Sequence, residues 1–397
     1  MERIFTNDKS IMIMKILLVV GNANDVFIYN FAKWLKSKMD VSIDVFSFFS
    51  SNKQGYDNKY YDNVYNPKLS FVSKIRYVRS FSTSFDQSCS LKRFIKDKHY
   101  DVIHCHWLLP STILTTNLSS HCDKLCATFW GGELEKQEIC HSHKLYMLYL
   151  KRFLKTVSVI ANSEDFFSKL NKKFHSLEKK YRIASLGSAT IDELYNLIET
   201  EEKKTSKQHL SIDSNKTTVL IGYSGKSLHN HIEIINELKK YSDHKEKIHI
   251  LAPMTRGGEE SYIKQVESAL IDSGFSYTLI SGRFLSDLEI ARIRNATDIT
   301  LQLSVFDGFS RSIVECLCAK SVLIYGNWLD YPKYLKTYNF SAIAVPSIAE
   351  GVAKCCNVVD NFNNYKISTE NNSLNGKDNF SWSKCIDGWI SIYKEQK

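Results

Sequence analysis

The sequence contains little proline and little glycine. Only 5 prolines and 16 glycines occur among 397 residues, so neither a collagen-like repeat nor a long Pro/Gly-rich linker makes up much of the chain. Hydrophobic residues account for 43% and charged residues for 24%, a globular composition that excludes wholesale disorder. At roughly 150 residues per domain, the length predicts two domains.

A long uninterrupted hydrophobic run is also absent. The longest apolar stretch, IMIMKILLVVG, is interrupted by Lys15. It is shorter than the roughly 20 apolar residues that a transmembrane helix needs. It continues directly into GNANDVFIYNFAKWL, which is typical of a turn followed by a helix. We therefore interpret the stretch as a buried first strand rather than a cleaved signal peptide.

The ten cysteines do not form the spaced pairs of a zinc site. Cys355 and Cys356 are adjacent, the pair in 316–318 is separated by one residue, and the pair in 122–126 is followed by no second pair at zinc-finger spacing. The pattern is typical of free thiols in a reducing cytoplasm. We expect no cofactor, and no metal is required.

Short β-branched runs alternate with helical patterns along the chain. KILLVV precedes the amphipathic FIYNFAKWLKSK, and the same rhythm restarts with TTVLIGYSG at 217–225. This alternation predicts an α/β fold with parallel sheets and helices on both faces. The Asn-rich stretch 362–377 predicts a loop, and the last segment spaces its apolar residues as in a helix that covers a surface. The predicted parts are an N-terminal Rossmann-like domain over 1–200, a linker over 201–216, a second Rossmann-like domain over 217–377, and a C-terminal helix over 378–397 that packs back on the first domain.

The positive charge is unevenly distributed. The chain carries 52 basic and 43 acidic residues, a net charge of +9, and residues 1–200 hold 28 and 20 of these. The most basic stretches are 51–100, with 10 basic and 4 acidic residues, and 151–182, with 9 and 3. Both are interpreted either as solvated faces or, more specifically, as contacts with an anionic membrane surface. A nucleic-acid-binding protein is an alternative class, but no RNA or DNA module is visible.

The strongest chemical motif is VFDGFSRSIVEC at 305–316, where a strand ends, turns and begins a helix. The free N–H groups and positive dipole of a helix start favour a phosphate. Arg311 adds a guanidinium suited to a bidentate phosphate contact. The carboxylates of Asp307 and Glu315 suit the hydroxyls of a sugar. An ordinary capped helix with a solvent-facing Glu315 is the alternative.

The first glycine turn, by contrast, lacks G-x-G-x-x-G, and the chain has no P-loop motif.

Other candidates follow predicted strands in the first half. His104 and His106 alternate in DVIHCHW, and we expect one to point inward and one outward. Trp107 and Trp130 are candidates for stacking on a sugar or a lipid. Glu133 is a candidate general base. Packing in the core is the alternative for the histidine and tryptophan rings, and a carboxylate at a helix start is the alternative for Glu133.

The D-x7-E spacing of Asp307 and Glu315, followed by CLCAKSVLIYG, resembles the E-x7-E segment of glycosyltransferase family 4, with Asp307 at the first acid and Glu315 at the second. The 297–326 block, DVIHCHW and SVIANSEDF are the segments most similar to that family. The resemblance implies the GT-B fold, with two Rossmann-like domains whose parallel sheets face each other across a cleft. It also implies a nucleoside diphosphate sugar donor, bound mainly by the second domain. More narrowly, WGGELEK, IGYSGKSLHNHIEII, PMTRGGEESYIKQV and NFSWSKCIDGW resemble the dTDP-linked Fuc4NAc transferases of enterobacterial common antigen, which act on an undecaprenyl-linked acceptor at the inner membrane.

The resemblance assigns roles to the candidate residues. Lys226 is retained where family 4 enzymes often have an Arg and a Lys, and Trp130 stands where many retaining members have a His, which puts the retaining active-site pattern in doubt. The catalytic candidates are Glu133, His106 and Asp307. The acceptor-side candidates are His104, Trp107 and Trp130. The donor- or nucleotide-binding candidates are Gly225, Lys226, Arg256, Arg283, Gly308, Phe309, Ser310, Arg311, Ser312 and Glu315.

These features predict a bacterial glycosyltransferase that moves a sugar from a nucleoside diphosphate sugar to a lipid-linked saccharide in O-antigen or capsule biosynthesis. The expected location is the cytoplasm, peripheral on the inner face of the inner membrane. The expected partners are the sugar donor, the lipid-linked acceptor and the anionic membrane surface, with no nucleic acid. A GT-B-like nucleotide-sugar 2-epimerase is the alternative enzyme, and hydrolysis of the donor without an acceptor would favour it.

Overall fold

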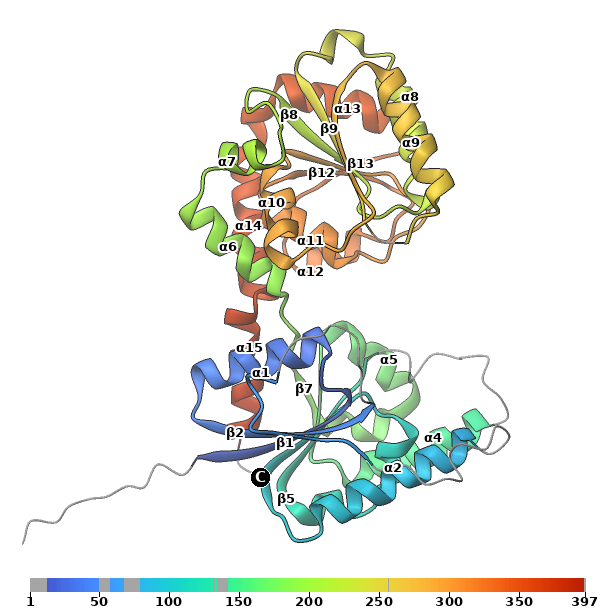
Figure 1. The fold of residues 1–397 in the computed structure, drawn as a ribbon, viewed down its shortest axis with the longest axis vertical. Helices are drawn as coiled ribbons and strands as arrows, with labels where there is room; N and C mark the ends of the chain where they lie inside the picture. The colour runs from blue at the N-terminus through green and yellow to red at the C-terminus, as the bar shows by residue number, and fades with distance from the viewer. Residues whose placement is uncertain are drawn as a thin grey trace, which may run out of the picture. The chain divides into compact units, whose positions relative to one another are not determined.

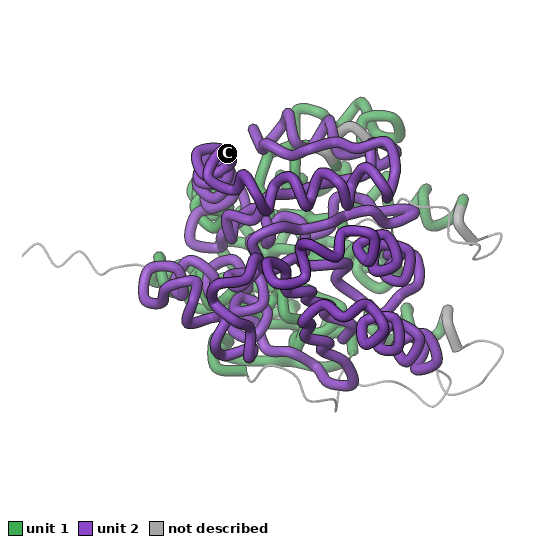
Figure 2. Tube along the Cα trace, turned by 90° about the horizontal axis from the view of Figure 1, so that it is seen from above, with its two compact units in different colours: residues 1–186, 385–397 green, residues 187–384 purple. Residues whose placement is uncertain are grey.

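The structure, a computed structural model, describes residues 13–49, 58–67, 79–130, 133, 142–255 and 257–395 (Figure 1). The chain divides into two compact units, shown in different colours in Figure 2. Unit 1 comprises residues 1–186 and 385–397, and unit 2 comprises residues 187–384. Each unit contains one parallel sheet with helices on both faces, which confirms the predicted α/β class.

The sheet of unit 1 is built around a strand that is buried on both faces. Seven parallel strands lie within the described residues, in the order β3–β2–β1–β4–β5–β6–β7. The central strand β1 is almost continuously apolar because helices cover both of its faces. The strands are β1 (Met14–Asn22), β2 (Val41–Phe49), β3 (Asn63–Tyr65), β4 (Tyr100–His106), β5 (Cys122–Thr128), β6 (Val159–Asn162) and β7 (Tyr181–Ile183).

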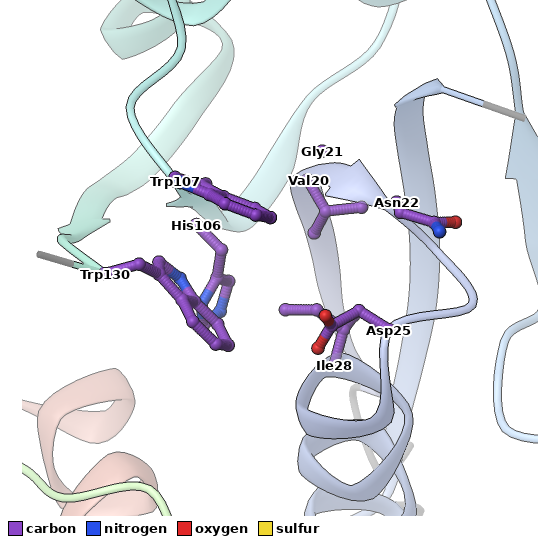
Figure 3. A pocket seen from close by; sticks show the side chains of 8 residues that line it. All are labelled: Val20, Gly21, Asn22, Asp25, Ile28, His106, Trp107 and Trp130. Atoms are coloured by element: carbon purple, nitrogen blue, oxygen red, sulfur yellow. The ribbon is translucent and has the colours of Figure 1, made fainter. Parts of the chain in front are cut away.

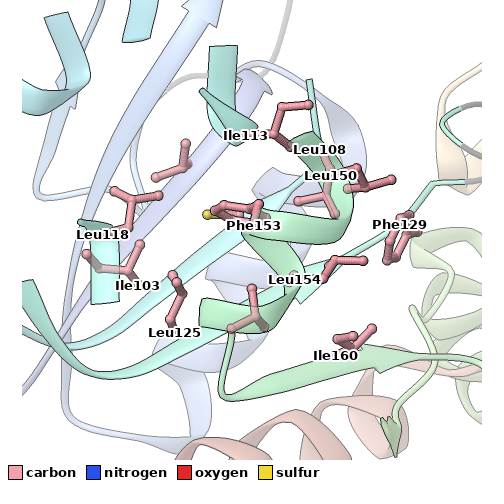
Figure 4. Packing of buried hydrophobic residues seen from close by; sticks show 14 of the residues in the cluster. Ile103, Leu108, Ile113, Leu118, Leu125, Phe129, Leu150, Phe153, Leu154 and Ile160 are labelled. Atoms are coloured by element: carbon pink, nitrogen blue, oxygen red, sulfur yellow. The ribbon is translucent and has the colours of Figure 1, made fainter. Parts of the chain in front are cut away.

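The larger core of unit 1 lies between the sheet and the helices of one face. Figure 4 shows Ile103 and Leu125 from the sheet packed with Leu150, Phe153 and Leu154 from α4. Each such buried side chain contributes about 1.5–3 kcal/mol of transfer free energy. This face is covered by α2 (Arg79–Ile95), α3 (Pro110–Ile113), α4 (Ser142–Thr156) and α5 (Glu164–Phe174).

The opposite face is covered by α1 (Val26–Lys38) and α15 (Trp382–Lys394). Trp389 and Tyr393 of α15 are buried, and the Tyr393 hydroxyl lies 2.6 Å from Nδ1 of His104 in β4. Lys124 donates a 2.6 Å hydrogen bond to the Ile392 carbonyl near the end of α15, where the helix dipole favours a cation. The prediction that the C-terminal helix packs back on the first domain is therefore confirmed, although the helix begins at Trp382 rather than at 378.

Unit 2 repeats the same architecture. Six parallel strands lie within its described residues, in the order β10–β9–β8–β11–β12–β13. The strands are β8 (Thr217–Ile221), β9 (Ile248–Met254), β10 (Ser276–Ser281), β11 (Ile299–Gln302), β12 (Val322–Gly326) and β13 (Ile343–Val345). One face is covered by α8 (His231–Leu238), α9 (Glu260–Ser273) and α13 (Ile348–Asp360), and the other by α6 (Ala189–Thr200), α10 (Asp287–Ala296) and α11 (Arg311–Cys318).

The predicted linker over 201–216 is wrong. This stretch contains α7 (Lys203–His209), and the chain passes into unit 2 at residue 187 rather than after residue 200. Lys207 and Lys203 pair with the buried Asp298 at 2.6 Å and 3.1 Å. Burial raises the pKa of Asp298, but the two lysines outweigh it and hold that pKa below its usual value. A charged stretch that looked solvated is thus held against the sheet by a buried partner.

The predicted loop over 362–377 is also wrong. Most of it forms α14 (Lys366–Phe380), which follows α12 (Pro332–Thr337) and α13 in the chain and packs on α11. The Asn372 side chain accepts a 2.7 Å hydrogen bond from the Ser341 N–H and donates a 2.8 Å bond to the Ser341 carbonyl. Asparagine favours turns when it bonds to its own backbone, but here a distant segment uses its amide.

None of the helices in the described part of the chain is both long enough and apolar enough to cross a membrane.

Candidate functional site

Both units place polar loops at the carboxyl ends of their strands, beside the strand where the sheet order changes direction. In unit 1 this strand is β1, between β2 and β4, and in unit 2 it is β8, between β9 and β11. Ligands of open parallel sheets bind at this position. Most of the described sequence-predicted site residues lie at these two edges.

A small pocket lies at this edge of unit 1 (Figure 3). It is formed by the ends of β1 and β4, the start of α1 and the residues that follow β4 and β5. The structure thus brings together three of the predicted residues, one of them proposed as catalytic and two as acceptor-side. The lining residues are Val20, Gly21, Asn22, Asp25, Ile28, His106, Trp107 and Trp130.

Two tryptophans form one side of this pocket. The rings of Trp107 and Trp130 are stacked, with centroids 5.9 Å apart and planes inclined by 29°. Trp107 has a left-handed backbone (φ 63°), and its ring approaches Gly21 so closely that a Cβ there would lie 3.1 Å from it. Nε1 of Trp130 is buried and has no hydrogen-bond partner among the described residues. Aromatic faces with a few polar groups are typical of small-ligand sites.

His106 presents an unsatisfied imidazole to the same pocket. The residue is 1% exposed, and neither ring nitrogen has a hydrogen-bond partner within the described chain. Burial lowers the pKa of His106 to about 3, so the ring is neutral at pH 7 and offers one donor and one acceptor. A buried polar group without a partner costs about 1–3 kcal/mol, which a ligand hydroxyl would offset.

Asp25 lies across the pocket from His106 (Figure 3). It is the N-cap of α1, and its carboxylate accepts a 2.9 Å hydrogen bond from the Phe27 N–H. Burial raises the pKa of Asp25 despite the backbone hydrogen bonds that lower it. Sequence reasoning missed this residue, although the turn GNAND after the first strand was the signal that could have located it.

His104 is not an acceptor-side residue. Its ring is fully buried, with Nδ1 2.6 Å from the Tyr393 hydroxyl and Nε2 2.8 Å from Oγ1 of Thr128. The rings of His104 and His106 have centroids 3.9 Å apart. The expectation that one points inward and one outward is wrong, because residues two apart on a strand share a face. His104 therefore joins β4 to α15.

Glu133 connects the loops that carry the two tryptophans. Its carboxylate accepts hydrogen bonds from the backbone N–H groups of Leu108, at 3.2 Å, and Trp130, at 3.1 Å. These contacts give Glu133 a positioning role for Trp107 and Trp130. Its role as a general base stays a prediction.

Two glycine turns meet at the corresponding edge of unit 2. A Cβ on Gly225, after β8, would lie 2.8 Å from the Cα of Gly258, after β9. A Cβ on Gly257 would lie 2.9 Å from Cε of Lys226, so the lysine stem crosses directly over that glycine. The side chain of Lys226 is exposed at this crossing. The predicted Arg256 lies outside the described residues.

The turn before α11 is held by Asp307. This buried carboxylate accepts hydrogen bonds from the hydroxyls of Tyr223 and Tyr331 and, at 3.1 Å, from the Ser310 N–H. These contacts give Asp307 a positioning role at the helix start, and a direct catalytic role stays a prediction. Ser310 is the N-cap of α11, so the backbone N–H groups of the first helical turn, including that of Ser312, lie directly beyond it.

Phe309 occupies a strained position in this turn. Its backbone is left-handed (φ 60°), and its ring stacks on Tyr334 with centroids 5.0 Å apart. Trp107 has the same left-handed backbone after β4, the strand equivalent to β11 in sheet order. Strained non-glycine residues cluster at functional sites. Trp107 and Phe309 therefore both indicate that the functional edge of each sheet is the one at the carboxyl ends of its strands. A Cβ on the neighbouring Gly308 would lie more than 4 Å from every described atom outside its two chain neighbours.

Glu315 does not face solvent. It is buried in α11, with its Oε2 3.2 Å from Nε of Arg294 in α10. Burial raises the pKa of Glu315, against the opposing effect of Arg294. The alternative of a solvent-facing Glu315 on an ordinary capped helix is therefore wrong. The pair joins α10 to α11, and contact between Glu315 and a donor ribose stays a prediction.

The remaining predicted cations have partners within the protein. The guanidinium of Arg311 lies 5.0 Å from the ring centroid of Phe380. Arg283 pairs with Glu289 at the start of α10. Contact of either side chain with a donor phosphate stays a prediction.

Two buried histidines beside the glycine turns were not identified from the sequence as site residues. Nε2 of His229 lies 2.9 Å from Oγ of Ser224, and Nδ1 of His231 lies 3.3 Å from the Tyr262 hydroxyl. Burial lowers the pKa of His229 to about 4 and that of His231 to about 3, so both are neutral at pH 7. The signal was the HNH triplet that follows GYSGKSL.

The cysteines within the described residues are free thiols, and all but Cys89 are buried. No group of three or more His, Cys, Asp or Glu side chains in that part of the chain is placed to hold a metal ion.

Residues 15–164 match a family model described as glycosyl transferase 4-like. The match covers most of the described part of unit 1 and ends just after β6. No curated relative matches the chain by sequence.

Several solved structures share the fold of both units. A glycosyltransferase from Rickettsia africae is 18% identical, with a TM-score of 0.70 over 96% of this chain and 98% of that chain. Sucrose-phosphate synthase from Thermosynechococcus elongatus is 10% identical, with a TM-score of 0.65 over 96% and 98%. Anabaena HepE in complex with UDP and glucose is 12% identical, with a TM-score of 0.59 over 96% and 99%. These likenesses show the GT-B fold. The family match and the GT-B fold together support an enzyme of the glycosyltransferase class.

Proposed function

We propose that this protein moves a sugar from a nucleoside diphosphate sugar to a saccharide acceptor. The observation that carries the proposal is the edge of the unit 2 sheet. There Lys226 crosses the paired glycine turns, and Tyr223, in the turn after β8, donates a hydrogen bond to Asp307 in the turn before α11. The family match over unit 1 and the UDP bound by the similarly folded HepE support it.

The unit 2 edge suits the diphosphate of a donor. The close approach of Gly225 and Gly258 leaves backbone without side chains beside the exposed ammonium of Lys226. The free N–H groups at the start of α11 add partial positive charge. When the bond to the anomeric carbon breaks, negative charge develops on the leaving diphosphate. Positive groups fixed in place before the reaction stabilise that charge.

The unit 1 pocket suits a sugar of the acceptor. The tryptophan faces match the apolar face of a sugar ring, and the unsatisfied imidazole of His106 matches a hydroxyl. A general base works best with a pKa near the working pH, and the pKa of His106 is about 3. We therefore assign His106 to hydroxyl binding. The general base remains the predicted role of Glu133.

The finer parts of the proposal rest on sequence resemblance. The segments similar to dTDP-linked Fuc4NAc transferases make a dTDP-sugar one candidate donor and a lipid-linked saccharide the candidate acceptor. Such an acceptor would place the enzyme at the inner face of the bacterial inner membrane, in O-antigen or capsule biosynthesis.

The direct test is a transfer assay. The purified protein is incubated with UDP-, GDP- and dTDP-sugars, with and without an undecaprenyl-linked saccharide, and the products are identified by mass spectrometry. We expect a glycosylated acceptor and one equivalent of nucleoside diphosphate. Loss of transfer is expected for Trp130→Ala but not for Trp34→Ala, a control on α1 that does not line the pocket. Donor hydrolysis with an epimerised free sugar, or no turnover in any combination, would contradict the proposal.

A further inference from the structure

Helix α4 turns two leucines away from the core. Leu150, Phe153 and Leu154 are buried on its inner side, within the core cluster of unit 1. On its outer side, Leu145 is 51% exposed and Leu148 is 49% exposed. Residues three apart are neighbours on a helix surface, so the two leucines form one small apolar patch.

Four basic side chains surround this patch. Lys144, Lys151, Arg152 and Lys155 are all exposed. At 100° per residue, these four and the two leucines fall within an arc of about 120°, while the buried side chains fall on the opposite side. Residues 142–156 contain no Asp or Glu. We call the six residues Lys144, Leu145, Leu148, Lys151, Arg152 and Lys155 the α4 face.

We infer that the α4 face is the surface by which this protein contacts an anionic lipid bilayer. Leucines set among cations are the composition of helices that lie in a membrane interface, where the apolar groups enter the acyl boundary and the cations meet lipid phosphates. Lys and Arg stems reach past apolar contacts to keep their charges in water. The absence of acidic residues in 142–156 favours this surface over a protein partner of mixed charge.

The same helix is connected to the pocket. Tyr146 of α4 donates a 2.8 Å hydrogen bond to the carbonyl of Leu108, the residue after Trp107. A bilayer bound at the α4 face would therefore contact the helix that supports one wall of the pocket. The inference rests on the proposed function, because a lipid-linked acceptor is presented at a membrane surface.

The test is co-sedimentation of the full chain with vesicles of phosphatidylcholine alone and of phosphatidylcholine mixed with phosphatidylglycerol. We expect binding to the anionic vesicles only, weakened by salt. Each basic residue near such a surface contributes about fivefold to the partition coefficient. Replacing both Lys151→Gln and Arg152→Gln is therefore expected to lower it by about 25-fold, and Leu145→Ser with Leu148→Ser is expected to lower it without any change of charge.

The matched control replaces Lys172→Gln and Lys173→Gln, two exposed lysines in the last turn of α5. This variant changes the net charge as much as the α4 charge variant but leaves the α4 face intact. We expect it to keep most of the binding. Equal binding to neutral vesicles, no binding to anionic vesicles, or equal losses in the α4 and α5 variants would overturn the inference. Unchanged far-UV circular dichroism excludes misfolding as the cause of a loss.

Transfer to an acceptor saccharide without its lipid separates this inference from the proposed function. If the proposed function is right but the α4 face does not bind membranes, the soluble acceptor is glycosylated and the protein does not bind anionic vesicles. If the reverse holds, the vesicles bind and no acceptor reacts.

Discussion

Lowering the pH from about 7 to about 5 is expected to destabilise unit 1 through two buried histidines. His104 and His106 are 0% and 1% exposed, and their ring centroids are 3.9 Å apart. Burial lowers the pKa of His106 to about 3. Burial and the neighbouring His106 hold the pKa of His104 well below its usual value. The folded protein therefore keeps both rings neutral at pH values where a free histidine binds a proton.

The direction of the effect is set by the state that binds the protons. A histidine in the unfolded chain has a pKa of about 6.5, so above that pH neither state is protonated and stability does not change with these groups. Below it, the unfolded state binds protons that the folded state excludes. The free energy of unfolding then falls by about 1.4 kcal/mol per pH unit for each histidine. At about pH 5 the two rings together cost about 4 kcal/mol, and the loss through His106 continues down to about pH 3.

Urea unfolding, followed by far-UV circular dichroism at several pH values, measures this loss. A His106→Gln variant removes one of the two titrating rings, so its stability is expected to fall about half as steeply below pH 6.5 as that of the natural protein, whatever its stability at pH 7. The reasoning is refuted if the unfolding free energy of the unit 1 transition stays constant from about pH 7 to 5, or if the variant shows the same slope as the natural protein.

Two substitutions in unit 2 test its packing. Gly187→Ala places a Cβ directly against the Cα of Trp382, so calorimetry should show a loss of about 1–3 kcal/mol in the free energy of unfolding. Gly308→Ala, whose Cβ would lie more than 4 Å from every described atom outside its chain neighbours, should lose much less, and equal effects would contradict the close approach. Asp298→Asn leaves the buried ammonium of Lys207 without its anionic partner, and the free energy of unfolding is expected to fall by about 3–5 kcal/mol. An unchanged midpoint temperature of thermal unfolding would show that the pair does not hold α7.

The elements that the sequence predicts well are those decided by local pattern. KILLVV is a continuous apolar run, and it forms β1 because a central parallel strand needs apolar side chains on both faces. The C-terminal helix is predicted because its apolar residues recur at helical spacing, and that side packs in unit 1. The errors at 201–216 and 362–377 arise where polar side chains find distant partners. Lys207 contacts Asp298, and Asn372 contacts Ser341. Neither contact can be predicted from the spacing of apolar and polar residues near it in the sequence.

The residues of the candidate site also differ in whether local sequence or distant contacts decide their position. Trp107 and Trp130 were found because they lie at the ends of predicted strands, and such ends meet at one edge of a parallel sheet. Asp25 was missed although it lies in the turn GNAND directly after the first strand, where the same rule places a ligand site. His104 was misplaced because the period of a strand puts it on the same face as His106, where α15 covers it.

The central claim is that the β8 edge of unit 2 binds the diphosphate of a sugar nucleotide. Isothermal titration calorimetry with UDP, GDP and dTDP measures it on the full chain, with Lys226→Ala as the test variant and Lys264→Ala, on the exposed surface of α9, as the control. A hydrogen bond to a charged group contributes about 1.5–3 kcal/mol, so we expect one nucleotide to bind the natural protein and the control equally and to bind Lys226→Ala about 10- to 100-fold more weakly. Absence of binding by all three nucleotides, or equal affinity for Lys226→Ala, would contradict the account.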